Sequence, residues 1–441
     1  NIVGRSTPAE ISVLERSEWG NAYGRVEALE IDQQTITGAD TIEESLTAEL
    51  KRISELNRQV TGIERRRMNP LNYELNQLRL EQRRLELDPP PAERALEVQR
   101  ALERQTYSLE EELATAETEL RALRAKVGDA ALIIRTGTGE ILRVPAAQIV
   151  RIWQPNQMSA WNKISHFAIS FWRFLSEYPR EANTEGGVYP AIFGTVLMVL
   201  LMSLLVTPLG VIAAIYLTEY AEQGPTVRLI RIAVNNLAGV PSIVYGVFGL
   251  GFFVYFIGGS LDRLFYEAAL PAPTFGTPGL IWASLTLALL TVPVVIVSTE
   301  EGLARIPRSI REGSLALGAT RAETLFRVIL PLASPSILTG AILAVARAAG
   351  EVAPLMLVGV VKSAPSLAID GNFPFLHLER KFMHLGFHIY DVGFQSPNVE
   401  AAQPLVYASA LLLVAIIVLL NLAAILLRGR LETRYRGTDY Q

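Results

Sequence analysis

The sequence predicts a mainly α protein. We expect a polar N-terminal part, with a helical hairpin and a small β element, followed by a polytopic helical membrane domain. Half of the 441 residues are hydrophobic and 19% are charged. Most of the charged side chains fall in residues 1–185, whereas several long uncharged runs follow Gly187. This segregation is typical of a polar domain fused to a membrane domain.

The overall charge and the absence of cysteine exclude some classes of protein. A net charge of -4 is close to neutral and argues against a nucleic-acid-binding protein. The sequence contains no cysteine, so disulfides and thiol chemistry are excluded. The first residue is Asn rather than Met, and we therefore expect the natural chain to begin further upstream.

Residues 1–160 predict a domain that carries a long helical hairpin. Partial alternation of apolar residues within 9–37 predicts weak strands. Apolar residues then recur every three or four positions over 41–127, and Asp88-Pro89-Pro90-Pro91 divides this stripe into two arms. Two striped helices joined by a proline turn predict an antiparallel coiled-coil hairpin. Pro70 lies inside the first arm and should kink or interrupt it.

A β-hairpin is predicted over residues 130–153. Thr136-Gly137-Thr138-Gly139 separates two apolar segments and is typical of a hairpin turn, and residues 148–153 can add a third strand. The domain has neither a cluster of His, Asp and Glu with metal-ligand spacing nor a phosphate-binding loop. It fits a docking surface or spacer, and it equally fits a self-contained structural insertion.

Residues 161–185 begin with an amphipathic pattern. Its apolar face consists of Ile164, Phe167, Ala168, Phe171, Phe174 and Leu175. Lys163 and His166 lie elsewhere on the helix, and aromatic residues flank the apolar stripe. The pattern predicts a helix that lies in the membrane interface.

Five apolar runs within residues 186–430 are long enough to cross a membrane. They lie at 190–217, 237–258, 279–298, 332–360 and 404–427. Arg is concentrated in the connections 218–236 and 299–331 and near the C-terminus. The positive-inside rule places these segments, including the tail 431–441, in the cytoplasm and residues 1–160 outside. Because the chain would then start outside, we expect one more span before residue 1.

The connection 299–331 carries a spaced motif. Its members are Arg311, Glu312, Gly313, Ser314, Gly318, Leu330 and Pro331. The spacing resembles the coupling loop of ABC-type import permeases, Glu-Ala-Ala-x-x-x-Gly-x9-Ile-x-Leu-Pro, with Gly313 and Ser314 in place of the two Ala. The resemblance implies a short cytoplasmic helix that docks on an ATP-hydrolysing subunit. An ordinary amphipathic loop helix is the alternative.

Three further stretches resemble the PstA-type permeases of bacterial phosphate importers. They are residues 179–192, 235–246 and 347–354, the last reading Arg347-Ala348-Ala349-Gly350-Glu351-Val352-Ala353-Pro354. The resemblance covers residues 179–436. It implies the type I importer fold in the inner membrane, with the N-terminal domain as an extracytoplasmic insertion. It also implies four partners: an ATPase dimer that binds ATP and Mg, a second, PstC-type permease, an extracytoplasmic phosphate-binding protein, and membrane lipid.

Arg347 and Glu351 are four residues apart within the predicted span 332–360. Charges at membrane depth cost about 2.5–3.5 kcal/mol each on insertion scales and rarely face lipid. An Arg guanidinium can bond two oxygens of an oxyanion at once, with Glu351 as its partner. A structural ion pair without substrate contact is the alternative, but the resemblance implies a role in transport. Because the pair cancels its own charge, we expect a second Arg from a partner permease.

The remaining motifs are weaker. His377, His384 and His388 lie in the loop 362–403 with Glu379 and Asp391, but their spacing is not that of a metal site. We therefore expect no metal or other cofactor in this chain. The sequence also lacks the Gly-x4-Gly-Lys-Ser/Thr loop, so a partner would hydrolyse ATP and this chain would not be an enzyme.

Two classes of function are open to this sequence. A permease for phosphate, or for another oxyanion such as sulfate or molybdate, uses all of these features. A membrane-anchored coiled-coil scaffold or signalling protein needs neither the charged pair nor the coupling motif.

Overall fold

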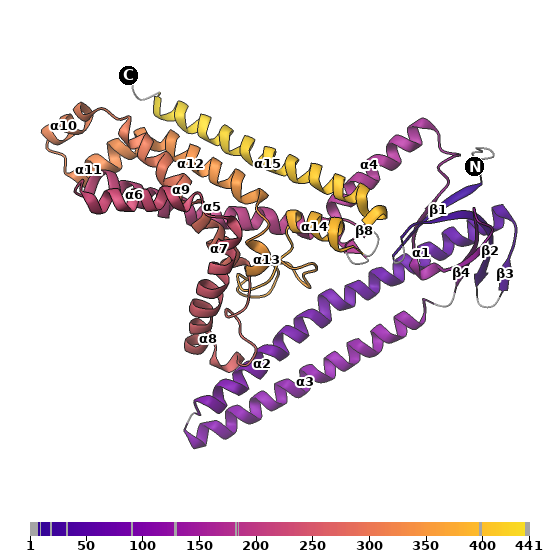
Figure 1. Ribbon diagram of the computed structural model, residues 1–441. Coiled ribbons are helices and arrows are strands. Elements are labelled where there is room, and N and C mark those ends of the chain that lie inside the picture. The colour runs from indigo at the N-terminus through magenta and orange to yellow at the C-terminus, as the bar shows by residue number, and fades with distance from the viewer. Residues whose placement is uncertain are drawn as a thin grey trace. The chain divides into compact units, whose positions relative to one another are not determined.

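The computed structural model describes residues 8, 10–17, 20–31, 34–89, 91–127, 130–180, 183, 185–396 and 399–436. The chain forms two compact units, whose elements are labelled in Figure 1. The first unit holds Asn1–Glu181 with Glu185–Gly187 and Glu267–Leu270, and the second holds the rest. Residues 437–441 of the predicted tail lie outside the described residues.

The first unit contains an antiparallel sheet of six strands. They are β1 (Ile11–Arg16), β2 (Ala22–Ile31), β3 (Gln34–Ile36), β4 (Ala131–Thr136), β5 (Ile141–Pro145) and β6 (Ile149–Trp153). The order is β5-β4-β2-β1-β6, and β3 pairs with β2. The strands on either side of the helical hairpin therefore form one sheet, because β2 pairs with β4 and β1 pairs with β6. Buried Leu14, Leu29 and Leu132 belong to its core.

The predicted helical hairpin is confirmed. Its first arm runs through α1 (Ala39–Ile63), the π-helical segment η1 (Glu64–Met68) and α2 (Asn69–Leu87), and its second arm is α3 (Ala92–Ala125). The arms lie side by side in Figure 1. The interruption that Pro70 predicts is η1, since proline has no N–H for the regular helical hydrogen bond. Arg67 and Glu119 join the two arms at 2.5 Å.

The first unit continues after the sheet with one helix and a short hairpin. α4 (Ala160–Ser176) begins at Ser159, whose side chain accepts a hydrogen bond from the Asn162 N–H at 3.2 Å. β7 (Pro179–Arg180) pairs with β8 (Glu185–Gly186). Two short 3-10 turns, η2 (Ala146–Gln148) and η6 (Glu267–Ala269), also belong to this unit.

The second unit is helical. Its elements are α5 (Tyr189–Ile215), η4 (Tyr216–Tyr220), α6 (Pro225–Leu237), α7 (Ser242–Phe248), η5 (Gly249–Gly258), α8 (Gly259–Phe265), α9 (Leu280–Ala304), α10 (Arg308–Ala316), α11 (Arg321–Thr324), η7 (Leu325–Ile329), α12 (Leu330–Gly350), α13 (Leu355–Val358), α14 (Leu385–Tyr390), η8 (Asp391–Gln395) and α15 (Val399–Arg436). Helices α5, α9, α12 and α15 run side by side (Figure 1).

Each of the five predicted spans is matched by a helix in the part of the chain that the structure describes. The helices long and apolar enough to cross a membrane run Tyr189–Tyr220, Ser242–Phe265, Leu280–Ala304, Arg321–Gly350 and Ala402–Leu426. The chain itself buries 67% of the most apolar stretch of α9 but only 11% of that of α15. Helix α9 therefore lies at the centre of the bundle, and α15 leaves most of its surface to lipid or to another chain.

Two boundaries of the predicted spans are wrong. The predicted span 237–258 starts later, at Ser242, because α6 is a separate helix and Pro241 begins the next one. The predicted span 332–360 ends early, because α12 stops at Gly350. Pro354 disfavours the helical conformation of the residue before it, so the helix ends ahead of it. The same helix starts at Arg321, so Leu330 and Pro331 lie inside it.

Candidate functional site

The short helix α10 lies within the predicted coupling segment 299–331. It ends at Gly318, which has a φ of 91° in the left-handed region. The Gly318 N–H donates to the Leu315 carbonyl at 3.0 Å, and the Ala319 N–H donates to the Ser314 carbonyl at 3.3 Å. This pair of bonds is the usual glycine-dependent end of a helix. The backbone conformation at the end of α10 therefore explains why the motif has a glycine at position 318.

Arg311 and Ser314 connect α10 to one end of each of three spans. These are the ends that the sequence predicts to be cytoplasmic. One terminal nitrogen of Arg311, Nη2, donates to Glu219 Oε1 at 2.9 Å and to the Leu303 carbonyl at 2.8 Å. The Ser314 and Thr324 hydroxyls are 2.9 Å apart. A displacement of α10 would therefore reach the helices that contain Glu219, Leu303 and Thr324.

The other side of α10 is exposed. Glu312 and Gly313 are exposed, and a Cβ added at Gly313 would meet nothing within 4 Å. Leu317 is 91% exposed, which is unusual for a leucine. Sequence reasoning missed Leu317, although an apolar residue inside a charged loop is a readable signal. It also missed the capping box of Thr320 and Glu323, whose spacing is visible in the sequence.

Leu330 and Pro331 lie at the base of this segment. Leu330 packs against a buried cluster that includes Leu303, Leu325 and Ile329. Pro331 lies inside the continuous helix Arg321–Gly350, directly after the π-helical segment η7, so its missing N–H falls at a point where the regular hydrogen-bond pattern is already interrupted. The structure thus separates the motif into an exposed helix and an apolar base.

The sequence predicted that Arg347 and Glu351 lie inside one unbroken span. In the structure they lie at the end of α12 instead. Arg347 is in the last turn, and Glu351 is the first residue beyond the helix, with extended backbone. Arg347 Nε and Glu351 Oε1 are 3.7 Å apart, too far for a hydrogen bond. The two side chains are 35% and 22% exposed. The predicted pair exists, but it is loose and partly open.

The non-helical segment that follows α12 is packed closely on two sides. A Cβ at Gly246 of α7 would lie 2.7 Å from Pro354 Cα. A Cβ at Gly386, in α14, would lie 2.6 Å from Val352 Cγ2. Only glycine permits such close packing at these two points. The segment that carries Glu351 is therefore tightly enclosed, although the Arg347–Glu351 pair is loose.

The three histidines of the loop 362–403 have structural surroundings. His377 lies between Asp370 and Glu379, with ring nitrogens 3.0 and 3.2 Å from their carboxylates. Burial lowers the pKa of both His384 and His388 to about 4, so both rings are neutral at pH 7. In the part of the chain that the structure describes, no group of three His, Cys, Asp or Glu residues is placed to hold a metal ion.

Comparison with known proteins identifies the family. Residues 206–437, a little over half of the chain, match the family described as binding-protein-dependent transport system inner membrane component. The phosphate transport system permease protein PstA of Mycobacterium leprae is 38% identical over 194 residues, which are 44% of this chain and 58% of that protein. PstA 1 of Mycobacterium tuberculosis (strain CDC 1551 / Oshkosh) is 37% identical over 194 residues, again 44% and 58%.

A further relative carries a different subunit name. The phosphate transport system permease protein PstC of Mesorhizobium japonicum is 31% identical over 201 residues, which are 44% of this chain and 60% of that protein. The chain thus spans less than two thirds of the length of these curated relatives. With its five membrane-length helices, the chain belongs to the binding-protein-dependent transport system inner membrane components, as a multi-pass permease subunit of the ABC importer type.

Proposed function

We propose that this chain is a transmembrane permease subunit of an ATP-driven importer of inorganic phosphate. It would lie in the bacterial inner membrane, with its C-terminus in the cytoplasm and its first unit outside. The relatives named for phosphate transport support the choice of substrate. The observation that carries the proposal is Arg347, whose loosely paired guanidinium is 35% exposed at the end of a membrane helix.

The exposed part of Arg347 needs polar surroundings beyond Glu351, its ion-pair partner among the described residues. A guanidinium facing lipid is unfavourable by about 2.5–3.5 kcal/mol on insertion scales. The exposed part of Arg347 therefore faces either a water-filled path or a second permease. At 3.7 Å, Glu351 leaves the N–H donors of Arg347 free to bond two phosphate oxygens. An Arg from a PstC-type partner would offset the charge of Glu351.

Energy would enter through α10. An ATPase dimer, which binds ATP and Mg, would receive the exposed face with Glu312, Gly313 and Leu317. Arg311 would pass the movement of α10 to Glu219 and Leu303, at the ends of two spans. An extracytoplasmic phosphate-binding protein would deliver the substrate from the other side. No scaffold or anchor needs this arrangement.

Uptake by the complete complex in vesicles tests the proposal. Labelled phosphate, sulfate and molybdate are offered to complexes with wild-type chain, Arg347→Gln or Arg347→Lys. We expect phosphate to be preferred, and Arg347→Gln to lower its uptake by roughly 100-fold, the cost of about 2.7 kcal/mol that a lost charged contact to a transferred anion carries. Arg347→Lys keeps the positive charge but lacks the planar guanidinium. Its phosphate uptake should therefore lie between that of the wild type and that of Arg347→Gln.

Two results would contradict the proposal separately. Preferred uptake of sulfate or molybdate by the wild-type complex would overturn the substrate but keep the permease. Unchanged phosphate uptake in Arg347→Gln, with the complex intact, would remove Arg347 from the path.

A further inference from the structure

Helix α4 turns its polar side toward its own sheet. The ring of His166 lies 4.9 Å from that of Trp153 in β6, centroid to centroid. Ser170 Oγ accepts a hydrogen bond from Arg151 Nη1 at 3.4 Å. Arg173, one turn further, forms an ion pair with Glu177. Residues spaced by four and three share one side of a helix, so this polar side is the one that faces the unit.

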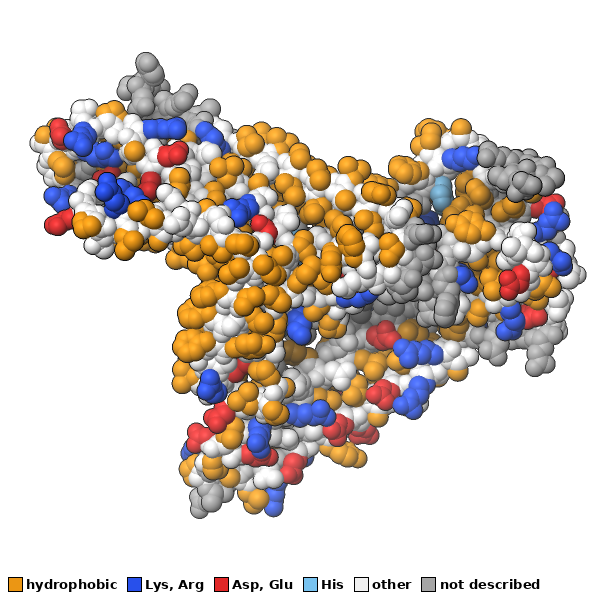
Figure 2. All heavy atoms as spheres, viewed as in Figure 1, with side chains coloured by type: hydrophobic (Ala, Val, Ile, Leu, Met, Phe, Trp, Pro, Cys, Tyr) orange, Lys and Arg blue, Asp and Glu red, His pale blue; other side chains and the backbone are white. Residues whose placement is uncertain are grey.

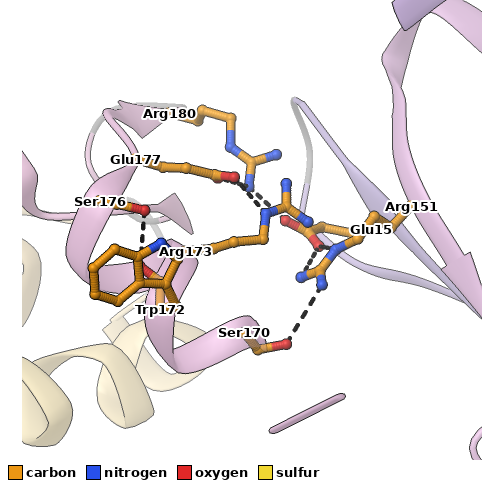
Figure 3. A network of polar contacts seen from close by, with 8 residues as sticks. All are labelled: Glu15, Arg151, Ser170, Trp172, Arg173, Ser176, Glu177 and Arg180. Atoms are coloured by element: carbon orange, nitrogen blue, oxygen red, sulfur yellow. Dashed lines mark hydrogen bonds and ion pairs between the residues drawn. The ribbon is translucent and has the colours of Figure 1, made fainter. Parts of the chain in front are cut away.

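A carboxylate at the centre of an arginine network fixes this contact (Figure 3). Glu15 of β1 accepts hydrogen bonds from Arg151 Nε at 2.7 Å and from Arg180 Nη2 at 2.5 Å. Its side chain is only 13% exposed. Burial alone would raise the pKa of Glu15, but the hydrogen bonds from Arg180 and Arg151 outweigh it and lower the pKa. Glu15 thus joins β1 to β6 and β7, on both sides of α4 in the sequence.

Most of the apolar side of α4 is exposed in the part of the chain that the structure describes. None of the helix residues is buried. Trp161, Ile164, Phe167, Phe171 and Trp172 are 76%, 59%, 71%, 52% and 68% exposed. Figure 2 shows hydrophobic side chains along the outer side of this helix. In a soluble domain an amphipathic helix does the reverse and buries its apolar stripe against the core.

The C-terminal end of α4 lies where the chain enters the membrane. The Gly187 N–H donates to the Tyr178 carbonyl at 3.2 Å. A Cβ at Gly187 would lie 2.3 Å from the Glu177 carbonyl oxygen, so this backbone packs directly on the end of α4. The first span begins two residues later, at Tyr189. The end of α4 is therefore joined to the first span by backbone that packs on it.

We propose that α4 is an interfacial anchor whose aromatic side lies in the headgroup region of the outer leaflet. Trp and other aromatic residues favour this region, where one edge of the ring is apolar and the other meets water. The occupant is lipid rather than protein, because the backbone at Gly187, which packs on the end of α4, continues within two residues into a membrane-length span. Through Glu15, Arg151 and Arg180 the anchor holds the sheet in one orientation on the membrane. This role is additional to transport.

A pair of single-cysteine variants tests the anchor, since residues 1–441 contain no cysteine. Ile164→Cys and Asn162→Cys are both exposed, and at 100° per residue they point to nearly opposite sides of α4. Each full-length chain receives a nitroxide label and is reconstituted into phosphatidylcholine–phosphatidylglycerol vesicles. We expect the label at 164 to be relaxed mainly by oxygen, which concentrates in lipid, and the label at 162 mainly by a water-soluble nickel chelate.

Other accessibility patterns overturn the anchor. Preferential relaxation of both labels by nickel would place α4 in water. Protection of residue 164 from both reagents would mean that protein covers the apolar side.

A second label on the sheet tests whether the orientation is held. Tyr23 in β2 is 59% exposed and accepts a label without loss of buried contacts. The distance distribution between labels at Tyr23→Cys and Ile164→Cys should be narrow, and Glu15→Gln should broaden it at least twofold. A broad distribution in the chain with Glu15 intact, or an unchanged one in Glu15→Gln, would refute the role of the network.

Discussion

The arginine network of the first unit and the charged pair of the second use the same residue types in opposite ways. Glu15 receives hydrogen bonds from two arginines at 2.7 and 2.5 Å and is 13% exposed (Figure 3). Glu351 stands 3.7 Å from its single arginine and is 22% exposed. In the first unit, Arg151 and Arg180 both form hydrogen bonds with Glu15 directly. In the second, Arg347 forms no hydrogen bond with Glu351, and the proposed transport role assigns its N–H donors to a substrate or a partner chain.

This difference distinguishes a structural ion pair from a candidate transport site. Removing one partner of a closely bonded, mostly buried ion pair destabilises the fold strongly, because the other charge is left buried and uncompensated. A loose pair contributes little to stability because its charges are not held in hydrogen-bonding geometry. It can exchange partners at a low cost. The proposed path through Arg347 depends on that looseness, and the following experiments test it.

Acidification should lower the stability of the two units by different amounts, and this is the largest effect that we expect. His384 and His388 have pKa values of about 4 in the folded chain, against an ordinary 6.5. A histidine with a lowered pKa loses its contribution as the pH falls, from about 6.5 toward 4. At pH 5 the loss is about 2 kcal/mol for each ring. The second unit should therefore open first on acidification.

Hydrogen exchange, corrected for the intrinsic pH dependence of amides, measures this. Between pH 7 and 5, peptides of α14 should lose protection while peptides of β1 and β6 keep theirs. The Glu15 pKa lies below its ordinary 4.5, so the contribution of Glu15 to stability is lost only below that pH. His388→Phe removes one titrating ring and should halve the effect in α14. Equal loss in both units would contradict the assignment.

Glu15→Gln should destabilise the first unit by about 2 kcal/mol, because it leaves the partly buried Arg151 without its charged partner and Arg180 with only Glu177, at 3.8 Å. This corresponds to roughly thirtyfold faster exchange in β1 and β6. Glu10→Gln is the matched control, because Glu10 pairs with Arg25 in the same unit but both side chains are 61% exposed. It should change little.

The same substitution in the loose pair sharpens the contrast. Glu351→Gln should cost less than about 1 kcal/mol of stability yet change phosphate uptake severalfold. A loss of stability as large as that of Glu15→Gln would mean that Glu351 is structural.

Gly318→Ala should destabilise the second unit by about 1 kcal/mol, because a side chain is strained at a φ of 91°. Gly313→Ala is its opposite control. Gly313 lies inside α10 with open space around it, so Ala should stabilise the helix by up to about 1 kcal/mol. Co-purification of the ATPase partner should weaken with Gly318→Ala relative to the wild-type chain. Equal retention would count against α10 as the docking element.

The sequence alone determined the elements and the family. Long uncharged runs predicted five spans because a bilayer demands about 20 apolar residues per helix. Leucine spacing and Pro89 to Pro91 predicted the helical hairpin, since heptad-like stripes and proline turns are local signals. The spacing of Glu312, Gly318 and Pro331 predicted a short helix in this connection. Helix α10 ends at Ala316, two residues before Gly318, which has the left-handed backbone that favours glycine.

Tertiary structure decided which distant residues meet. The pairing of β1 with β6 and of β2 with β4 spans the whole helical hairpin, and no local pattern encodes such a partner. The meeting of Glu15 with Arg151 and Arg180 follows from that sheet and was invisible in the sequence. The end of α12 before Glu351 depended on packing around Pro354, Gly246 and Gly386 as well as on proline itself. Local chemistry sets the helices and turns, whereas close bonding at Glu15 and looseness at Arg347 arise only from how those elements pack.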